Sequence, residues 1–418
     1  MAGAPPELTT IERARELVLE RVIRLGAEEV PLRQAVGRFL AADVAAADDI
    51  PGFDNSAMDG YAVRAADVAA AAPGGPVSLR LTGESSAGHP AEGELGAGEA
   101  FAISTGAAVP AGADAVVRVE DTSREGESVL VEAAVPEGES IRRAGEDIRA
   151  GERVLESGAR LGAAEIGALA AVGHPTVTCA RRPRVSLLLT GDELVEPGEP
   201  LGPGQIRDSN AYAVPPLAAD AGAEVASVEI APDDLEGTVA ALDRALDADV
   251  VIACGGVSVG EHDHVRPALE RLGAEQVFWR VSLRPGKPTY FGVAPGGKLV
   301  LGLPGNPVSA MVTFLLFARP ALLAMQGGEP GAPRITAAIA GDYAKVQGRA
   351  EAIRVRLSAD ERGWVATPTG PQGSHVLTSM IGADGLAIVP TEVERLRGGD
   401  AVEVELLGWA TPPVASNR

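Results

Sequence analysis

The stretch CGGVSVGEHDHV, from Cys254 to Val265, combines two kinds of chemistry. Its glycines follow the apolar run DVVIAC, and glycine allows backbone N–H groups to approach an anion closely. A helix that begins after such a turn adds a favourable partial positive charge for phosphate. Glu261 and Asp263 follow directly, and carboxylates repel phosphate unless a hard cation such as Mg²⁺ lies between them. The motif therefore predicts a phosphate site that uses Mg²⁺, with candidate residues Gly255, Gly256, Ser258, Gly260 and Asp263.

Two further loops have the same character. They are LLLTGDEL, with Thr190, Gly191, Asp192 and Glu193, and LGLPGNPVS, with Pro304, Gly305 and Asn306. Each follows a short apolar run typical of a strand buried on both faces of a parallel sheet. Because ligands bind beyond the carboxyl ends of such strands, we expect the three loops to converge on one binding site. Glu193 and Asp263 are the candidate Mg²⁺ ligands. The alternatives are a helix N-cap or first-turn acid for Glu193 and a solvated turn for Glu261 and Asp263.

Basic residues lie close together in FWRVSLRPGKPTYFG, residues 278–292. In an extended segment Arg280 and Arg284 would share a face, and Lys287 stands between two prolines that stiffen the turn. Taken alone, such residues often mark a solvated surface. Here the chain has a formal net charge of -22, and these basic residues lie beside a predicted anion-binding site. We therefore expect them to bind the ligand.

Other catalytic chemistries have little support. His262 and His264 could face one way on a strand and bind zinc, but no third close ligand accompanies them. With 5 histidines the chain carries neither a G-x-S-x-G elbow nor an HExxH helix. Cys179 and Cys254 indicate neither a disulfide framework nor a zinc site with four ligands. We therefore expect the protein to supply no nucleophile.

The composition argues against several classes of partner. Acidic residues outnumber basic ones by 58 to 36, so a general attraction to nucleic acid or to an anionic membrane is not expected. Aromatic residues make up 3%, which is too few for a base-stacking surface. No uninterrupted apolar stretch is long enough for a membrane span, and the N-terminal residues lack the order of a signal peptide. We expect a cytoplasmic protein that binds small anions.

Periodicity assigns elements to these motifs. Residues 9–25 have helical spacing with Thr10 as N-cap, and residues 161–173 return to a helical pattern after a region of short apolar runs and Gly/Pro turns. We expect these two helices to pack together, with a β domain inserted between them. From residue 184 strands alternate with helices, as in a doubly wound α/β domain. Short strands return near the C-terminus.

Three helices are expected inside the α/β region. One covers Asn210 to Ala221, one is capped by Asp233 or Asp234, and one begins with Asn306 as cap and Pro307 at its first position. The expected domains are a discontinuous helical one (1–47 and 146–183), an inserted β domain (48–145), the α/β domain (184–326) and a C-terminal β domain (327–418).

Taken together, the motifs resemble one family. FDNSAMDGYA, STGAAVPAGADAVV, RRAGEDI, TGDEL, GGVSVGEHD, RPGKP, GLPGNPVSA and QGSH look like the signature series of the molybdopterin molybdenumtransferase (MoeA) family, which includes the E domain of gephyrin. The match extends from residue 10 to residue 407. The resemblance implies a homodimer in which the α/β domain binds molybdopterin and the C-terminal domain is a β barrel. It also implies an active site between the α/β domain of one subunit and the inserted β domain of the other.

The reaction implied by the resemblance converts adenylylated molybdopterin and molybdate into molybdenum cofactor and AMP, with Mg²⁺ required. The dithiolene sulfurs of the substrate receive the metal, which agrees with the lack of a protein nucleophile. Other enzymes of cofactor assembly are implied as further partners. Arg280 and Arg284 stand where relatives often carry Lys, and the spacing at Asp233 differs by one residue. Position by position, the resemblance implies activity for Asp59, Thr105, Glu193, Asp233 and Asp263, and molybdate binding for Arg284, Lys287, Arg354 and Ser374.

Two other functions stay open at this point. Adenylyl transfer to molybdopterin, the preceding step, resides on a similar α/β domain, although the extra β domains and FDNSAMDGYA favour metal insertion. A scaffolding role, as the E domain of gephyrin has at receptors, finds no specific support in the residues.

Overall fold

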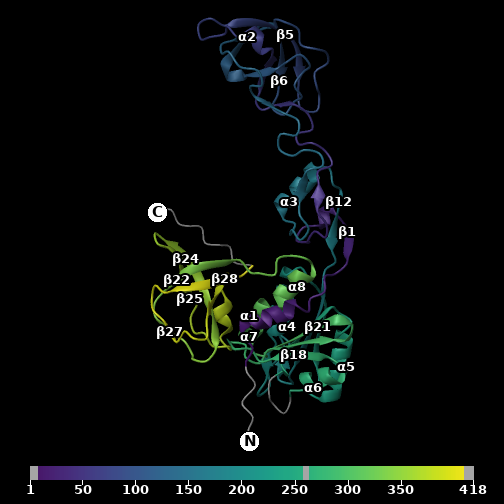
Figure 1. Ribbon diagram of the computed structural model, residues 1–418, viewed down its shortest axis with the longest axis vertical. Helices are drawn as coiled ribbons and strands as arrows, with labels where there is room; N and C mark the ends of the chain where they lie inside the picture. The colour runs from purple at the N-terminus through teal and green to yellow at the C-terminus, as the bar shows by residue number, and fades with distance from the viewer. Residues whose placement is uncertain (1–7, 258–262, 409–418) are drawn as a thin grey trace.

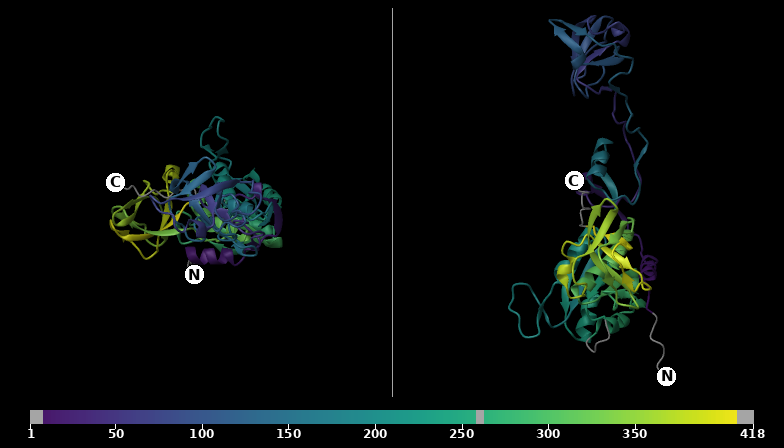
Figure 2. Two further views of the ribbon diagram at one scale, coloured as in Figure 1. Left: turned by 90° about the horizontal axis from the view of Figure 1, so that it is seen from above. Right: turned by 90° about the vertical axis from the view of Figure 1, so that its left-hand side faces the viewer.

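The computed structural model describes residues 8–257 and 263–408 of the 418-residue chain. The molecule is elongated, and Figure 1 shows its parts along the long axis. The α/β domain and a C-terminal β barrel lie at one end, a small module occupies the middle, and a β domain forms the far end. The right-hand view of Figure 2 shows the same separation. Groups at the two ends of one chain are therefore far apart.

A six-stranded sheet forms the centre of the α/β domain, in the order β16-β13-β17-β21-β20-β18. Its first four strands are parallel, and β20 runs antiparallel to both of its neighbours, β21 and β18. The chain leaves β13 toward one side and later returns on its other side as β17, so the strand order reverses there. The strands are β13 (Arg184–Thr190), β16 (Glu224–Ala231), β17 (Val250–Cys254), β18 (Glu275–Trp279), β20 (Tyr290–Ala294) and β21 (Lys298–Leu303).

Helices cover both faces of this sheet, which confirms the doubly wound prediction. Alternate residues of one strand enter different cores: Val250 and Ile252 join one cluster, whereas Val251 joins the other. The first cluster includes residues of α4 (Asn210–Asp220) and α7 (Pro307–Thr313). The second includes residues of α5 (Leu235–Ala245) and α6 (Val265–Arg271). The continuous apolar runs in the sequence arise because both faces are buried.

The helix N-termini were predicted with mixed success. The hydroxyl of Thr10 accepts a hydrogen bond from Arg13 N at 3.2 Å, and the Asp234 carboxylate accepts one from Gly237 N at 2.8 Å, so both are caps. Asn306 occupies the N-cap position of α7, and Pro307 stands at the first turn as expected. The Asn306 side chain makes no capping bond, however; its Nδ2 instead donates to Ser374 Oγ at 3.1 Å. Asn306 therefore links the α/β domain to the C-terminal domain.

The N-terminal region differs from the helical domain that the sequence predicted. Helix α1 (Ile11–Leu19) packs against α8 (Arg319–Met325) and the π-helical turn Phe314–Ala318, so Ile11 and Val18 enter the α/β core. Helix α3 (Ala163–Ala171) lies in the middle module and packs near residues of η1 (Leu32–Gln34). The expectation that these two helices pack together is therefore wrong. The module is built largely from strand pairs, β1 (Ala27–Pro31) with β12 (Thr176–Ala180) and β2 (Val44–Ala45) with β11 (Arg153–Leu155).

The apolar helical stretch Pro307–Met325 explains where α1 packs. It is long and apolar enough to cross a membrane by length and composition alone, yet 83% of it is buried inside the protein. It joins α7, the π-helical turn and α8 into the central element of the larger core. Its apolar surface on the side of the sheet is covered by β strands, and α1 covers part of the rest.

The inserted domain contains a six-stranded sheet in the order β7-β4-β6-β5-β9-β8. Its core includes Val63, Leu79 and Val117, and the helix α2 (Ala65–Val68) packs beside it. The strands are β4 (Gly60–Val63), β5 (Val77–Ser85), β6 (Glu99–Ile103), β7 (Ala115–Arg118), β8 (Thr122–Glu125) and β9 (Ser128–Val131). At its base β3 (Asn55–Ser56) pairs with β10 (Ile141–Arg142).

The C-terminal domain contains a closed five-stranded barrel, as the resemblance implied. Strand order runs β24-β25-β22-β28-β26, and β26 pairs back to β24. The short strand β19 (Leu283–Arg284), which lies between β18 and β20 of the α/β sheet in the chain, pairs with the start of β24. This pairing brings the basic RPGKP segment to the barrel. The barrel strands are β22 (Arg334–Ile339), β24 (Ala350–Asp360), β25 (Gly363–Pro368), β26 (Gly385–Val389) and β28 (Ala401–Leu406).

Glu405 ties the barrel to α1. Its carboxylate accepts hydrogen bonds from Arg15 at 2.7 and 2.6 Å and from Arg334 at 2.8 Å, and its side chain is 7% exposed.

We expect Glu405→Ala to lower the free energy of unfolding by about 3 kcal/mol, because Arg15 is left partly buried without its counter-charge. Glu403→Ala is the matched control: Glu403 lies on the same strand, is exposed and bonds Thr336. It should change the free energy by less than about 0.5 kcal/mol in guanidinium unfolding followed by tryptophan fluorescence. Equal effects of the two changes would contradict the assignment.

Candidate anion-binding site

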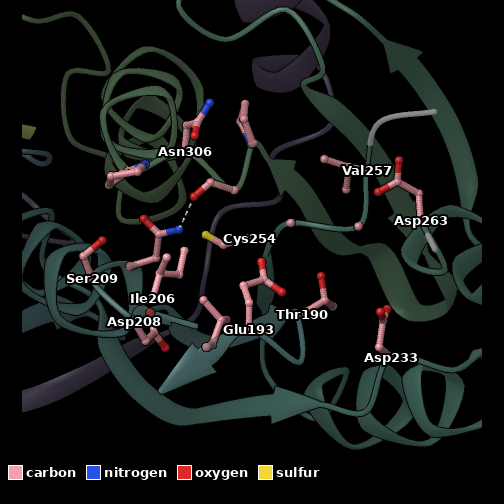
Figure 3. Close-up of a pocket in the computed structure, with 18 of the residues that line it drawn as sticks. Thr190, Glu193, Ile206, Asp208, Ser209, Asp233, Cys254, Val257, Asp263 and Asn306 are labelled. Atoms are coloured by element: carbon pink, nitrogen blue, oxygen red, sulfur yellow. Dashed lines mark hydrogen bonds between the residues drawn. The ribbon is translucent and has the colours of Figure 1, made fainter. Parts of the chain in front are cut away.

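The three chemically marked loops line one cavity, which confirms the prediction that they converge. The cavity has a volume of about 500 Å³ and lies at the carboxyl ends of β13, β17 and β21. Figure 3 shows it with Thr190 and Glu193 from the first loop, Val257 and Asp263 from the second, and Asn306 from the third. We call it the glycine cavity. Its lining includes Thr190, Gly191, Glu193, Gly255, Gly256, Asp263, Pro304, Gly305 and Asn306.

Glycine at 255 is required by packing as well as by backbone conformation. Its φ is +93°, and a Cβ there would lie 2.8 Å from Thr190 Oγ1 and 3.0 Å from Thr190 O. Its N–H donates to Leu303 O at 3.1 Å and is therefore not available to an anion. Gly255 thus holds the three loops close together. This role differs from the anion-cradling role that the motif suggested for this residue.

Three of the predicted acidic side chains line the cavity. Glu193, Asp233 and Asp263 all belong to the lining, and in Figure 3 Asp233 and Asp263 lie on the same side. Asp192 is exposed and does not line it. Ser258 and Gly260, like Glu261, lie outside the described residues. Within residues 8–257 and 263–408, no group of three or more His, Cys, Asp or Glu forms a ready-made metal site.

A second cavity adjoins the first. Its volume is about 400 Å³, and it shares Pro288, Pro304 and Asn306 with the glycine cavity. We call it the basic cleft, because Arg284, Lys287, Arg349 and His375 line it together with Ser374. The α/β domain and the barrel both contribute to its wall. The structure therefore brings Arg284, Lys287 and Ser374 together, as the resemblance implied.

A buried carboxylate supports Arg284. Glu351 Oε1 lies 3.6 Å from Arg284 Nη1, and the Glu351 side chain is 1% exposed. The same oxygen accepts a hydrogen bond from Tyr343 Oη at 2.8 Å. Glu351 is thus held in place by the barrel and fixes the guanidinium at the edge of the cleft.

Arg354 lies behind the cleft, and it is not part of the lining. It is fully buried and donates to Ser379 Oγ at 3.2 Å, Ala352 O at 3.1 Å and Gly373 O at 3.4 Å. Its backbone N–H donates to Gln372 Oε1 at 2.8 Å. Burial lowers the pKa of Arg354 to about 10. In this structure Arg354 therefore shapes the loop that presents Ser374.

Arg280 is not on a shared face with Arg284, so that prediction is wrong. Strand β18 ends at Trp279, and Arg280 has a φ of +76°, which turns the chain. The guanidinium carbon of Arg280 lies 3.9 Å from the centroid of the Trp279 ring, and that of Arg266 lies 3.8 Å from it. Trp279 Nε1 in turn donates to Val257 O at 2.9 Å, and Val257 lines the glycine cavity. Arg280 therefore reaches neither cavity but stacks on a residue that holds the cavity wall.

Asp59 and Thr105 form a pair of their own in the inserted β domain. Asp59 Oδ1 accepts hydrogen bonds from Thr105 N at 2.7 Å and Thr105 Oγ1 at 3.0 Å. The bond from the backbone N–H, followed by that from the hydroxyl, lowers the pKa of Asp59. Both residues are exposed, and their domain lies at the opposite end of the molecule from the glycine cavity. Within one chain they do not contribute to that cavity.

Asp208 and Asn210 also line the glycine cavity, although the sequence motifs did not indicate them. They stand in RDSN: Asn210 is the first residue of the predicted helix and of α4, and Asp208 precedes both. The available signal was an acid and an amide at the N-terminus of a helix that follows a predicted ligand loop.

Comparison with known proteins agrees with this architecture. Three family models match in succession: "MoeA N-terminal region (domain I and II)" over residues 9–173, "Probable molybdopterin binding domain" over residues 186–324, and "MoeA C-terminal region (domain IV)" over residues 336–407. "Molybdopterin molybdenumtransferase 2" of Mycobacterium tuberculosis strain H37Rv is 38% identical over 404 residues, which is 95% of this chain and 99% of the relative. "Molybdopterin molybdenumtransferase" of Haemophilus influenzae is 35% identical over 404 residues, which is 95% of this chain and 98% of the relative.

A solved structure shows the same fold. The crystal structure of the molybdopterin biosynthesis MoeA protein from Pyrococcus horikoshii OT3 has a TM-score of 0.82 and 31% sequence identity, covering 96% of this chain and 100% of that chain. The fold and the cavity thus define a multidomain enzyme built around an α/β domain of the molybdopterin-binding kind. The chain belongs to the MoeA family, whose curated members are molybdenumtransferases of molybdenum cofactor biosynthesis.

Proposed function

We propose that this protein transfers molybdenum from molybdate to adenylylated molybdopterin and releases AMP. The observation that supports this most is the pair of adjoining cavities. One has glycine turns and acids suited to a phosphoanhydride with a cation, and the other has basic side chains suited to a tetrahedral oxyanion. A shared wall of Pro288, Pro304 and Asn306 would hold the two substrates side by side. Holding two reactants in contact is itself a large part of catalysis.

The residues of the glycine cavity fit a bound Mg²⁺. Mg²⁺ is commonly held by one or two carboxylates together with substrate phosphates, so it needs no ready-made cage. Glu193 and Asp263 would hold it, since both carboxylates line the cavity and come from neighbouring loops. When bound, the ion supplies charge to the phosphoanhydride oxygens. The neighbouring Asp233 lies on the same side as Asp263 and completes the acidic edge.

The basic cleft is proposed to bind molybdate. Lys287 supplies a compact charge, and Arg284, fixed by Glu351, supplies a guanidinium whose donors can pair with two oxygens. Ser374 adds a hydroxyl donor that Asn306 already orients through its 3.1 Å hydrogen bond. These side chains bind and orient the oxyanion, and the sulfurs that replace its oxygens belong to the other substrate.

The active site is proposed to be completed by a second subunit of a homodimer. Asp59 and Thr105 match positions that the family resemblance associates with activity, yet their domain lies far from the glycine cavity of the same chain. An elongated chain can place its far end over the cavity of a partner related by two-fold symmetry. The hydrogen bonds from Thr105 keep the Asp59 carboxylate ionised and oriented for that purpose.

The proposed reaction is tested by its requirement for molybdate. Purified protein incubated with adenylylated molybdopterin and Mg²⁺ should release AMP when molybdate is added and not without it. Transfer of AMP from ATP to molybdopterin would instead assign the preceding step. Release of AMP at the same rate with and without molybdate would contradict metal transfer.

The close approach at Gly255 leads to a prediction about substrate binding. Gly255→Ala puts a Cβ within 2.8 Å of Thr190 Oγ1 and forces the two loops apart, so the KM for adenylylated molybdopterin should rise about tenfold. Gly198→Ala is the matched control, because Gly198 also has a positive φ of +103° but nothing within 4 Å of its Cβ position. Steady-state AMP release from both variants checks this. A similar rise in KM for the two changes would attribute the effect to backbone strain alone.

A further inference from the structure

Two buried acceptor atoms in the glycine cavity have no partner within the described part of the chain. Asp208 is 2% exposed; its Oδ1 accepts from Ala211 N at 3.0 Å, and its Oδ2 is unpaired. Asn210 is 7% exposed; its Nδ2 donates to Gly305 O at 2.8 Å, the bond drawn as a dashed line in Figure 3, and its Oδ1 is unpaired. The bond to Gly305 determines which end of the Asn210 amide is the oxygen. Both unpaired atoms are therefore hydrogen-bond acceptors.

Unpaired buried acceptors are costly, and a protein normally satisfies them with protein, water or ligand. Both residues line the cavity, so a bound ligand can supply the missing donors. Burial also raises the pKa of Asp208, which is consistent with a carboxyl group shielded from water. A ligand with N–H groups at this point would relieve the cost.

The lining of the cavity also contains apolar residues. Leu194, Ile206, Cys254 and Pro307 line it together with the two acceptors. In Figure 3 Asp208 and Ile206 lie on the opposite side from Asp233 and Asp263, with Cys254 and Glu193 between them. The acidic edge therefore serves one part of a ligand, and the two acceptors serve another. Apolar walls with a few polar groups are typical of a site for a heteroaromatic ring.

The type of ring follows from the hydrogen-bonding pattern. Two acceptors require a ring edge with two donors. The 2-amino group and N3–H of a pterin form such an edge, whereas the adenine edge pairs the donor N6 with the acceptor N1. We propose that Asp208 and Asn210 bind the 2-amino-4-oxo edge of the pterin ring and thereby place the pterin, not the adenine, at the start of α4. This inference rests on the proposed function, because it takes adenylylated molybdopterin as the ligand.

The experiment compares two fluorescent ligands in direct binding titrations. Pterin carries the 2-amino group, and lumazine carries a 2-oxo group in its place. Wild-type protein should bind pterin about tenfold or more tightly than lumazine, because the oxo group faces acceptor oxygens. In Asp208→Asn the side-chain oxygen can still accept from Ala211 N, while the other atom becomes an NH₂ donor. The preference should therefore disappear or reverse toward lumazine, and binding of AMP should stay within about twofold.

Asp243→Asn serves as the control, since Asp243 is exposed on α5 in the same domain and loses the same charge. It should retain the wild-type preference for pterin. If circular dichroism shows that Asp208→Asn is unfolded, the inference is tested on the wild-type protein with a third ligand, 4-oxopteridine. This ligand lacks the 2-amino group and should also bind at least about tenfold less tightly than pterin. Equal binding of these ligands by the wild-type protein would overturn the inference. The inference would also be overturned if Asp208→Asn no longer bound AMP but still bound pterin more tightly than lumazine.

Failure of this inference is distinguishable from failure of the proposed function. Protein that releases AMP only with molybdate, but does not discriminate pterin from lumazine, contradicts the inference alone. Protein that discriminates the two ligands, but releases no AMP with molybdate, contradicts the proposed function alone.

Discussion

Asp263→Asn is expected to lower the rate of AMP release by about a hundredfold or more, while the protein stays folded. Asp263 lines the glycine cavity on the same side as Asp233, directly before α6. The amide keeps the size of the side chain but removes the charge that lets a carboxylate bind Mg²⁺ beside phosphate. The loss should therefore appear in kcat and should not be recovered at saturating adenylylated molybdopterin.

The control for this change is Asp243→Asn, an exposed site in the same domain. It should keep the wild-type rate within about twofold, because surface charges far from a site contribute little. A titration with Mg²⁺ adds a second readout: Asp263→Asn should need a higher concentration for its residual activity. Wild-type turnover in Asp263→Asn would remove this residue from the active site.

Mixed dimers of Asp59→Ala and Asp263→Asn subunits are expected to regain activity that neither variant has alone. If each site combines the α/β domain of one subunit with the inserted domain of the other, a mixed dimer contains one intact site and one doubly altered site. Random exchange at equal concentrations makes half of the dimers mixed, so the mixture should reach about a quarter of the wild-type rate.

A second mixture controls for this result. Asp263→Asn mixed with Glu193→Gln should regain nothing, because both changes affect the same α/β domain and every site then contains one of them. Subunits with different affinity tags show that exchange has taken place. Equal failure of both mixtures after proven exchange would mean that each site lies within one chain, contrary to the position of Asp59 at the far end of the molecule.

Much of the α/β domain was predictable because its signals are local. Runs such as DVVIAC and KLVLGL became β17 and β21, and the loops that follow them line one cavity because parallel strands end at the same edge. The caps at Thr10 and Asp234 were predictable for the same reason, since each bond spans three residues.

The failures all depend on contacts between distant segments. The apolar face of α1 is evident from the sequence, but the surface that it packs against is not. It packs against the core helix Pro307–Met325 and not against α3. Arg280 and Arg284 are separated by a turn at Arg280 and by the pairing of β19 with the barrel. The position of Arg354 behind the Ser374 loop depends on barrel closure. Asp208 and Asn210 were missed because unpaired acceptors become visible only when every neighbour is known.

The central claim is that the two anionic substrates occupy adjoining cavities, and diffraction from crystals soaked with AMP and tungstate, as a heavy analogue of molybdate, tests it most directly. Anomalous scattering locates the tungsten atom without ambiguity. We predict an anomalous peak in the basic cleft beside Lys287 and Ser374, with the AMP phosphate in the glycine cavity facing Asp263. Tungstate bound on a separate surface, or AMP outside the glycine cavity, would contradict the account.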